Sequence, residues 1–256
     1  MKILVIGDVV GPCGRKFLEK HLWRLRKEFS ADMTVVNGEN MSSGNGILPC
    51  DADALFDAGA DVITTGNHVF QRREIYDYLD DKKYIIRPAN YPACCPGRGY
   101  CTYETAGASV AVINIMGNMY LEPLESPFDR IDAILEGTRA DVVLVDFHAE
   151  ATSEKKALGY YLDGRVAALF GTHTHVQTAD ERILPGGTGY ITDLGMTGAY
   201  SSVLGIKTDI IIEKFRTCMP QRFFQEDADC EMCGIILDID ESCGKTREIS
   251  RVALRG

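Results

Sequence analysis

Residues 2–11 read KILVIGDVVG, and this opening stretch sets the pattern for the fold. The apolar run from Lys2 to Ile6 has the length of a buried strand and ends at Gly7-Asp8. Pro12 follows at a position suited to the first turn of a helix, and apolar residues then recur at helical spacing as far as Phe29. The chain therefore opens with a strand, a polar loop and a helix, as α/β sheets do.

The same alternation continues through residue 175, and we expect one domain over residues 1–256 because α/β domains commonly reach this length. Beyond residue 180, short apolar runs separated by glycines indicate a second, more antiparallel sheet. The fold class is thus α/β, with two packed sheets and helices outside. Further strands are predicted at 33–36, 61–65, 109–115, 141–147, 166–170, 210–213, 234–239 and 248–254, and helices at 49–58, 71–79, 128–139 and 153–162.

Composition narrows the function classes. The chain has 27 Lys+Arg and 37 Asp+Glu, a net charge of -10, which disfavours non-specific binding to a nucleic-acid backbone. No apolar stretch reaches the roughly 18 residues of a membrane-spanning helix, so no membrane partner is expected. The short N-terminal apolar run meets an acid at Asp8, unlike a secretory signal, and favours a cytoplasmic location.

The nine cysteines are an odd number in a chain without an evident export signal, which favours reduced thiols over a disulfide framework. Cys230-x-x-Cys233 has half the spacing of a structural zinc site. Two interpretations are left open for this pair: a zinc or redox site, and ordinary reduced thiols.

The informative polar residues come just after predicted strands. Ligands of open α/β sheets collect at the carboxyl ends of parallel strands, where the loops meet. Five strand ends carry side chains that commonly bind metals: Asp8, Glu39 with Asn40, Asn67 with His68, His148, and His173 with His175. Such a mixture of carboxylate, amide and imidazole groups suits two metal ions about 3.5–4 Å apart that share a bridging carboxylate.

Each of these residues also has a structural interpretation when it is taken alone. Asp8 could cap a helix, Asn67 could form a turn, and His148 could be a hydrogen-bonded core histidine. His173 and His175 would point to opposite faces of a regular strand, so they can reach adjacent metals only if their backbone is irregular. Glu150, Thr152 and Ser153 could line the same pocket, or Thr152 or Ser153 could cap the next helix. His21 is interpreted as a helix residue without a catalytic role.

Together the motifs resemble the calcineurin-like metallophosphoesterases, and within them the YmdB-like subfamily, described as 2′,3′-cyclic-nucleotide 2′-phosphodiesterases. The resemblance spans essentially the whole chain and implies a four-layer αββα sandwich. It rests on five stretches: residues 6–11 (IGDVVG), 36–40 (VNGEN), 65–68 (TGNH), 171–180 (GTHTHVQTAD) and 192–198 (TDLGMTG).

The resemblance also implies a ligand set for two ions. One ion would be held by Asp8, Glu39, Asn40 and His175, and the other by Glu39, Asn67, His148 and His173, with Glu39 bridging. Ordinary members of the superfamily have a histidine where this chain has Val10, and Asn40 is expected to take its place. The subfamily points to iron, although manganese or zinc fits the same donors.

The expected reaction is attack of a metal-bridging hydroxide on phosphorus, with His68 as the general acid for the leaving alkoxide. The substrate would be a small phosphodiester, a 2′,3′-cyclic or possibly a 3′,5′-cyclic nucleotide. A broad-specificity phosphatase and a nucleotide-sensing regulatory protein with incidental hydrolysis are the alternatives. A homo-oligomer is left open.

Overall fold

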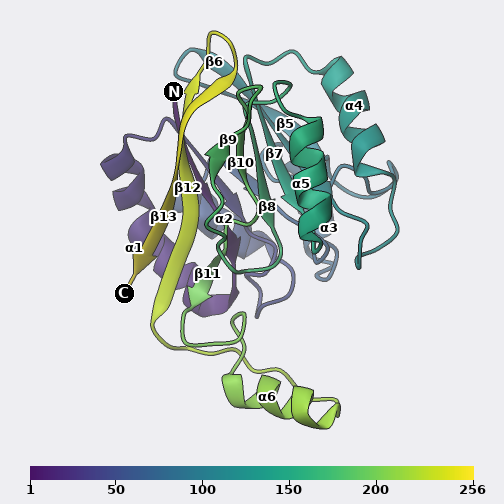
Figure 1. Cartoon of the computed structure of the whole chain (residues 1–256). Helices are drawn as coiled ribbons and strands as arrows, with labels where there is room; N and C mark the ends of the chain where they lie inside the picture. The colour runs from purple at the N-terminus through teal and green to yellow at the C-terminus, as the bar shows by residue number, and fades with distance from the viewer.

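The computed structural model describes residues 1–256 and consists of two β-sheets packed face to face between helices (Figure 1). The first sheet contains β1 (Lys2–Ile6), β2 (Asp8–Val9), β3 (Met33–Asn37), β4 (Val62–Thr64), β11 (Met196–Ala199), β12 (Cys230–Asp240) and β13 (Lys245–Arg255). The second contains β5 (Tyr100–Thr105), β6 (Ala108–Met116), β7 (Val142–His148), β8 (Ala168–Thr172), β9 (Arg182–Ile183) and β10 (Gly189–Ile191). The helices are α1 (Gly11–Phe29), α2 (Pro49–Asp57), α3 (Ile75–Asp81), α4 (Pro127–Gly137), α5 (Thr152–Tyr161) and α6 (Thr208–Thr217).

Both sheets are mixed. In the first sheet the strand order is β2-β11-β12-β1-β3-β4, and β13 also pairs with β12. Strands β1, β3 and β4 of this sheet run parallel to one another. In the second, β6, β7, β8 and β10 are parallel, and β5 and β9 close the edges in the antiparallel direction. The carboxyl ends of these parallel strands and the loops after them contain the polar residues that were predicted to bind metals.

The core has three apolar layers. Ile3 and Val5 of β1 pack with Val110 and Val112 of β6 in the layer between the sheets. The opposite faces of the two sheets are covered by helices, which bury apolar side chains of α1, α2 and α3 on one side and of α4 and α5 on the other. Figure 1 shows α1 and the pair α4 and α5 on opposite sides of the sheets. The predicted four-layer αββα arrangement is therefore confirmed.

The prediction of a separate antiparallel sheet beyond residue 180 was wrong. β12 and β13 do form an antiparallel hairpin, but β12 pairs with β1, so Ile3 faces Leu237 within the first sheet. β10 extends the second sheet beside β8. The first sheet thus contains strands from the N-terminal and C-terminal parts of the chain. β3 pairs with one edge of β1, and the distant strand β12 pairs with the other.

Residues 210–213 were predicted as a strand but belong to helix α6. Asp209 lies in the first turn of this helix and Lys214 and Arg216 in the last, where they complement the helix dipole. Only Ile211 of the helix is buried, and Figure 1 shows α6 projecting from the body of the molecule. Helical charge placement therefore outweighs the strand preference of the three consecutive isoleucines.

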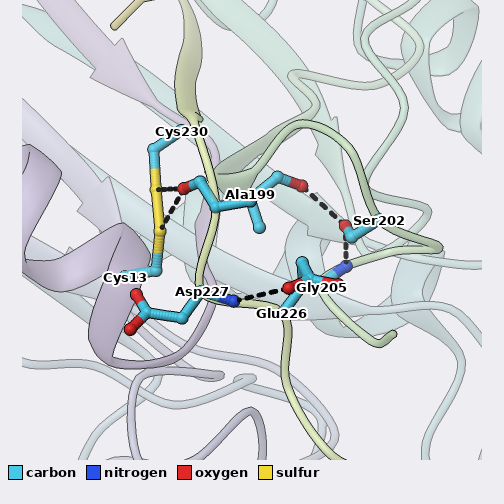
Figure 2. Close-up of a disulfide and its surroundings, with 8 residues drawn as sticks. Cys13, Ala199, Ser202, Gly205, Glu226, Asp227 and Cys230 are labelled. Atoms are coloured by element: carbon cyan, nitrogen blue, oxygen red, sulfur yellow. Dashed lines mark hydrogen bonds between the residues drawn. A yellow bond between two sulfur atoms is a disulfide. The ribbon is translucent and has the colours of Figure 1, made fainter. Parts of the chain in front are cut away.

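The cysteines also differ from expectation, because Cys13 and Cys230 form a disulfide, with Cα atoms 6.8 Å apart (Figure 2). Cys13 lies in the first turn of α1 and Cys230 is the first residue of β12, and these elements pack together although the two cysteines are 217 positions apart. Cys233 is a buried free thiol three positions along the strand, where side chains point to the opposite face. Cys230 and Cys233 therefore do not form the shared zinc or redox pair that was left open.

The same region closes the base of the segment that carries α6. Ser202 Oγ donates to the carbonyl of Ala199 at 2.6 Å and accepts from the amide of Gly205 at 2.8 Å (Figure 2). The Glu226 amide donates to the Gly205 carbonyl at 2.9 Å, which joins the two chain segments that lead to and from α6.

None of the helices has both the length and the apolar character needed to cross a bilayer.

Candidate metal centre

All seven predicted ligand residues lie at one edge of the two packed sheets. Asp8 follows β1, Glu39 and Asn40 follow β3, and Asn67 and His68 follow β4 in the first sheet. His148 ends β7 in the second sheet, where it pairs with Thr172, and His173 and His175 follow β8. The centre therefore forms where the carboxyl ends of both sets of parallel strands converge.

Glu39 is the residue on which the other donors meet. Its carboxylate is fully buried, and Oε1 lies 3.1 Å from Nε2 of His148. Oε1 also accepts from Nδ2 of Asn40 at 3.1 Å, and Oε2 accepts the backbone amide of His68 at 3.1 Å. One carboxylate thus contacts groups from β7 and from the loops after β3 and β4.

His148, Asn67 and His173 form a compact set of donors next to Glu39. His148 Nε2 lies 3.0 Å from Asn67 Oδ1 and 3.1 Å from His173 Nδ1. Glu39, His148 and His173 offer ligand atoms that all lie within 4.8 Å of one another. Such spacing is that of donors around a single cation.

Asp8, Asn40 and His175 form a second group of donor residues. His175 Nε2 is 3.2 Å from Asn40 Nδ2 and 3.8 Å from Asp8 Oδ1. Asp8 Oδ1 and His175 Nδ1 are buried without any hydrogen-bond partner, which is costly for polar atoms in a protein interior. A cation beside the Asp8 carboxylate would remove that cost for Oδ1, so this second group also fits a metal ion.

The backbone around the two histidines is irregular, as the sequence analysis required. β8 ends at Thr172, and His173 and His175 have φ values of 98° and 65°. The left-handed region lets both side chains turn toward the same centre instead of to opposite faces.

Gly66 provides room for the cluster. A Cβ atom there would lie 2.3 Å from both Glu39 Oε2 and His148 Nε2. Any side chain at this position would displace the donors, which explains the glycine immediately before Asn67.

Comparisons with known proteins identify the family of the chain. The family described as YmdB-like protein matches residues 4–252. This chain belongs to the YmdB-like family. A 2′,3′-cyclic-nucleotide 2′-phosphodiesterase of Bacillus subtilis (strain 168) is 44% identical over 256 residues, covering 99% of this chain and 97% of the relative.

Two solved structures superimpose on the whole chain. A hypothetical protein from Thermus thermophilus has a TM-score of 0.95 and 39% identity, covering 100% of this chain and 99% of that one. A novel phosphatase from Mycoplasma pneumoniae has a TM-score of 0.94 and 32% identity, covering 100% and 93%. The fold is therefore shared over nearly full length with these proteins.

Protonation differs sharply among the donors of this YmdB-like site. Burial and the carboxylate of Glu39 raise the pKa of Asp8 to about 8. Burial opposes ionisation of Glu39 as well, but the adjacent His148 lowers the pKa of that carboxyl to about 2. Glu39 in turn raises the pKa of His148 to about 9 against the effect of burial. Burial, reinforced by the charge of His148, lowers the pKa of His173 to about 3.

We therefore expect metal binding at pH 7 to release protons from Asp8 and His148, because both must lose a proton to become ligands. Since their pKa values lie above 7, apparent metal affinity should rise as the pH is raised from 6 to 8, by about tenfold per unit for each proton displaced. Calorimetric Mn²⁺ titrations in two buffers of different ionisation enthalpy measure this release. Asp8→Asn should release one proton fewer, and a pH-independent affinity in the parent protein would contradict the assignment.

Buried residues behind the candidate ligands were not identified from the sequence. His148 Nδ1 contacts Thr172 Oγ1 at 2.9 Å, and this hydroxyl donates to Asp146 Oδ1 at 2.7 Å. The contact fixes the imidazole so that its Nε2 faces Glu39. Asp146 could have been noticed as the one charged residue inside the apolar run 142–147.

Of the three residues predicted to line the pocket or cap the next helix, only Glu150 lines the pocket, and neither Thr152 nor Ser153 caps α5. Glu150 lines the pocket over the centre, together with His68 and Leu204, and its Oε2 lies 3.1 Å from His173 Nε2. Thr152 and Ser153 are in the first turn of α5, and the N-cap position is Ala151 without a side-chain cap. His21 is on α1 beside Phe17, as predicted for a helix residue.

Proposed function

We propose that this protein is a two-metal phosphodiesterase that hydrolyses 2′,3′-cyclic nucleotides. The observation that carries the proposal is the buried Glu39 carboxylate between two sets of donor atoms, each drawn from both sheets. A carboxylate in that position can bridge two cations, and the open pocket above it leaves room for an anionic substrate.

The proposed ligands follow from these two sets. Asp8, Glu39, Asn40 and His175 would hold one ion, and Glu39, Asn67, His148 and His173 the other. Ions bound there would supply an acidified water as nucleophile and positive charge for the phosphoryl oxygens. Oxygen and imidazole donors suit iron, manganese or zinc, and we propose iron on the likeness to the family.

Asn40 connects the metal site to the proposed acid. Its Oδ1 lies 2.8 Å from Nδ1 of His68, while its Nδ2 faces Glu39 and His175. Asn40 Oδ1 can accept the Nδ1 proton of an imidazolium His68. The imidazolium can then give its Nε2 proton to a leaving alkoxide and remain as the neutral imidazole with its proton on Nδ1.

The pocket walls favour a small substrate. Glu150 and Leu204 flank the histidines, and neither lysine nor arginine lines the pocket. Phosphate binding would therefore depend on the bound ions, which provide local positive charge within a chain of net charge -10. This argues for a cyclic nucleotide and against a nucleic-acid strand held by its backbone.

The substrate class rests on the 44% identity to the Bacillus subtilis enzyme. A broad-specificity phosphatase is the second candidate, favoured by the likeness to the Mycoplasma pneumoniae phosphatase. A nucleotide-sensing protein with incidental hydrolysis needs no proton donor beside the ligands, so His68 argues against it. Location in the cytoplasm and self-association stay predictions.

A substrate panel tests the proposal. We expect hydrolysis of a 2′,3′-cyclic nucleotide to the 3′-phosphate, with a kcat/KM above those for the 3′,5′-cyclic isomer and for p-nitrophenyl phosphate. Bis-p-nitrophenyl phosphate serves as a control diester that lacks a nucleobase. Preference for the monoester would favour the phosphatase, and tight nucleotide binding without turnover would favour the sensor.

A further inference from the structure

Lys155 and Asp193 form a fully buried ion pair directly behind the two histidines that follow β8. Lys155 Nζ donates to Asp193 Oδ2 at 2.7 Å, and both side chains have no exposed surface. Neither residue is among the proposed metal ligands. A buried pair of this kind is costly to desolvate, so its position calls for an explanation beyond stability.

Thr174, which lies between the two histidines, is bound to this pair. Its backbone amide donates to Asp193 Oδ2 at 3.1 Å and its hydroxyl donates to the same oxygen at 2.7 Å. His173 and His175 on either side have positive φ values, a conformation that non-glycine residues adopt only when surrounding contacts hold it. Asp193 is thus the acceptor that fixes the turn between both imidazoles.

Lys155 extends the same support to the residue before His173. Its ammonium also donates to the Thr172 carbonyl at 2.8 Å, so one cation contacts the end of β8 and the anchor of Thr174. The other oxygen of Asp193 accepts the Gly195 amide at 2.9 Å.

Close backbone packing leaves this arrangement little freedom. A Cβ at Gly171 would lie 1.9 Å from the Thr192 carbonyl, so the segment carrying Asp193 contacts the end of β8 directly. The pair therefore sits on a rigid support from which it can set the direction of both imidazoles.

We propose that Lys155 and Asp193 are positioning residues that set the metal affinity of both ions by fixing the 173–175 turn. The inference rests on the proposed metal site, because His173 and His175 are assigned there to different ions. Loss of the Lys155–Asp193 pair should weaken the binding of both ions. A pair that served stability alone would leave the metal affinity of the folded protein unchanged.

The test measures Mn²⁺ dissociation constants of the full chain by calorimetry with a competing chelator, without reference to catalysis. We expect Asp193→Asn to weaken the binding of both ions by about 10–100-fold and Thr174→Val to weaken it by about tenfold, as for other residues that support metal ligands. Thr174→Ser keeps the hydroxyl and should retain affinity close to that of the parent protein. Thr174 is partly exposed, so its variants keep the assay usable if the buried Asp193 variant fails to fold.

Thr138→Val is the matched control, because its hydroxyl donates to the Ile134 carbonyl at the end of α4, outside the pocket. Unchanged Mn²⁺ affinity in folded Thr174→Val, or an equal loss in Thr138→Val, would overturn the inference. Parent protein that binds two Mn²⁺ but does not hydrolyse cyclic nucleotides would refute the proposed function and leave this inference standing. Parent protein that binds no Mn²⁺ would refute both.

Discussion

Glu39→Gln should deplete both metal ions together and lower phosphodiester hydrolysis by at least about 10³-fold. The carboxylate contacts both donor sets, because its Oε1 lies 3.1 Å from His148 Nε2 of one set and 3.1 Å from Asn40 Nδ2 of the other. A neutral amide supplies less charge and cannot bridge two cations in the same way. Metal content of the purified variant by elemental analysis, together with the rate on bis-p-nitrophenyl phosphate, measures the effect.

Glu181→Gln is the matched control, because Glu181 is an ion-paired carboxylate that contacts Arg251 outside the pocket. This variant should keep the full metal content and activity. Two retained ions and near-native activity in Glu39→Gln would show that Glu39 does not bridge, and loss of one ion alone would assign it to a single site.

His68→Ala should keep both ions and lower hydrolysis of a 2′,3′-cyclic nucleotide by about 10²–10⁴-fold, the usual contribution of a general acid. The sugar alkoxide needs a proton as it leaves, whereas p-nitrophenolate leaves readily without one. The loss on bis-p-nitrophenyl phosphate should therefore be much smaller. Rates on the two substrates, with metal content determined on the same samples, separate acid catalysis from metal binding.

His21→Ala provides the control histidine, since His21 is on helix α1 and packs against Phe17. An equal loss on both substrates would contradict the role of His68 as the acid. Depletion of metal in His68→Ala would instead make the residue part of the metal support, through its 2.8 Å contact with Asn40.

That the seven candidate ligands lie close together could be predicted from the sequence, because a topological rule was enough. Polar residues that follow apolar runs of parallel strands meet at one sheet edge, whichever strands are neighbours. The structure brings Asp8, Glu39 and His148 together on that basis, although they come from two different sheets. Neither the order of the strands nor the division into two sheets was needed for this step.

Pairings between distant segments could not be predicted in the same way. β12 fills the free edge of β1, and Cys13 meets Cys230, only because residues more than 200 positions apart pack together. No local pattern near Cys13 or Ile3 specifies those partners. The supporting residues were missed for a related reason, since Lys155 reads as an ordinary helix lysine until Asp193 is placed beside it.

The net charge of -10 also takes on a different meaning in the structure. It argues against a nucleic-acid backbone as ligand, yet two of the acids, Asp8 and Glu39, are fully buried in the centre. Their charge would be offset by bound cations, so a small anion can be accepted within an acidic protein.

The central claim is that two ions per chain are needed for phosphodiester hydrolysis, and a metal titration tests it most directly. Metal-free protein is titrated with Mn²⁺ while the rate on a 2′,3′-cyclic nucleotide is followed at pH 8. Our account predicts negligible activity without metal and a rate that rises to a plateau at two ions per chain. A plateau at one ion, or full activity in the metal-free protein, would contradict it.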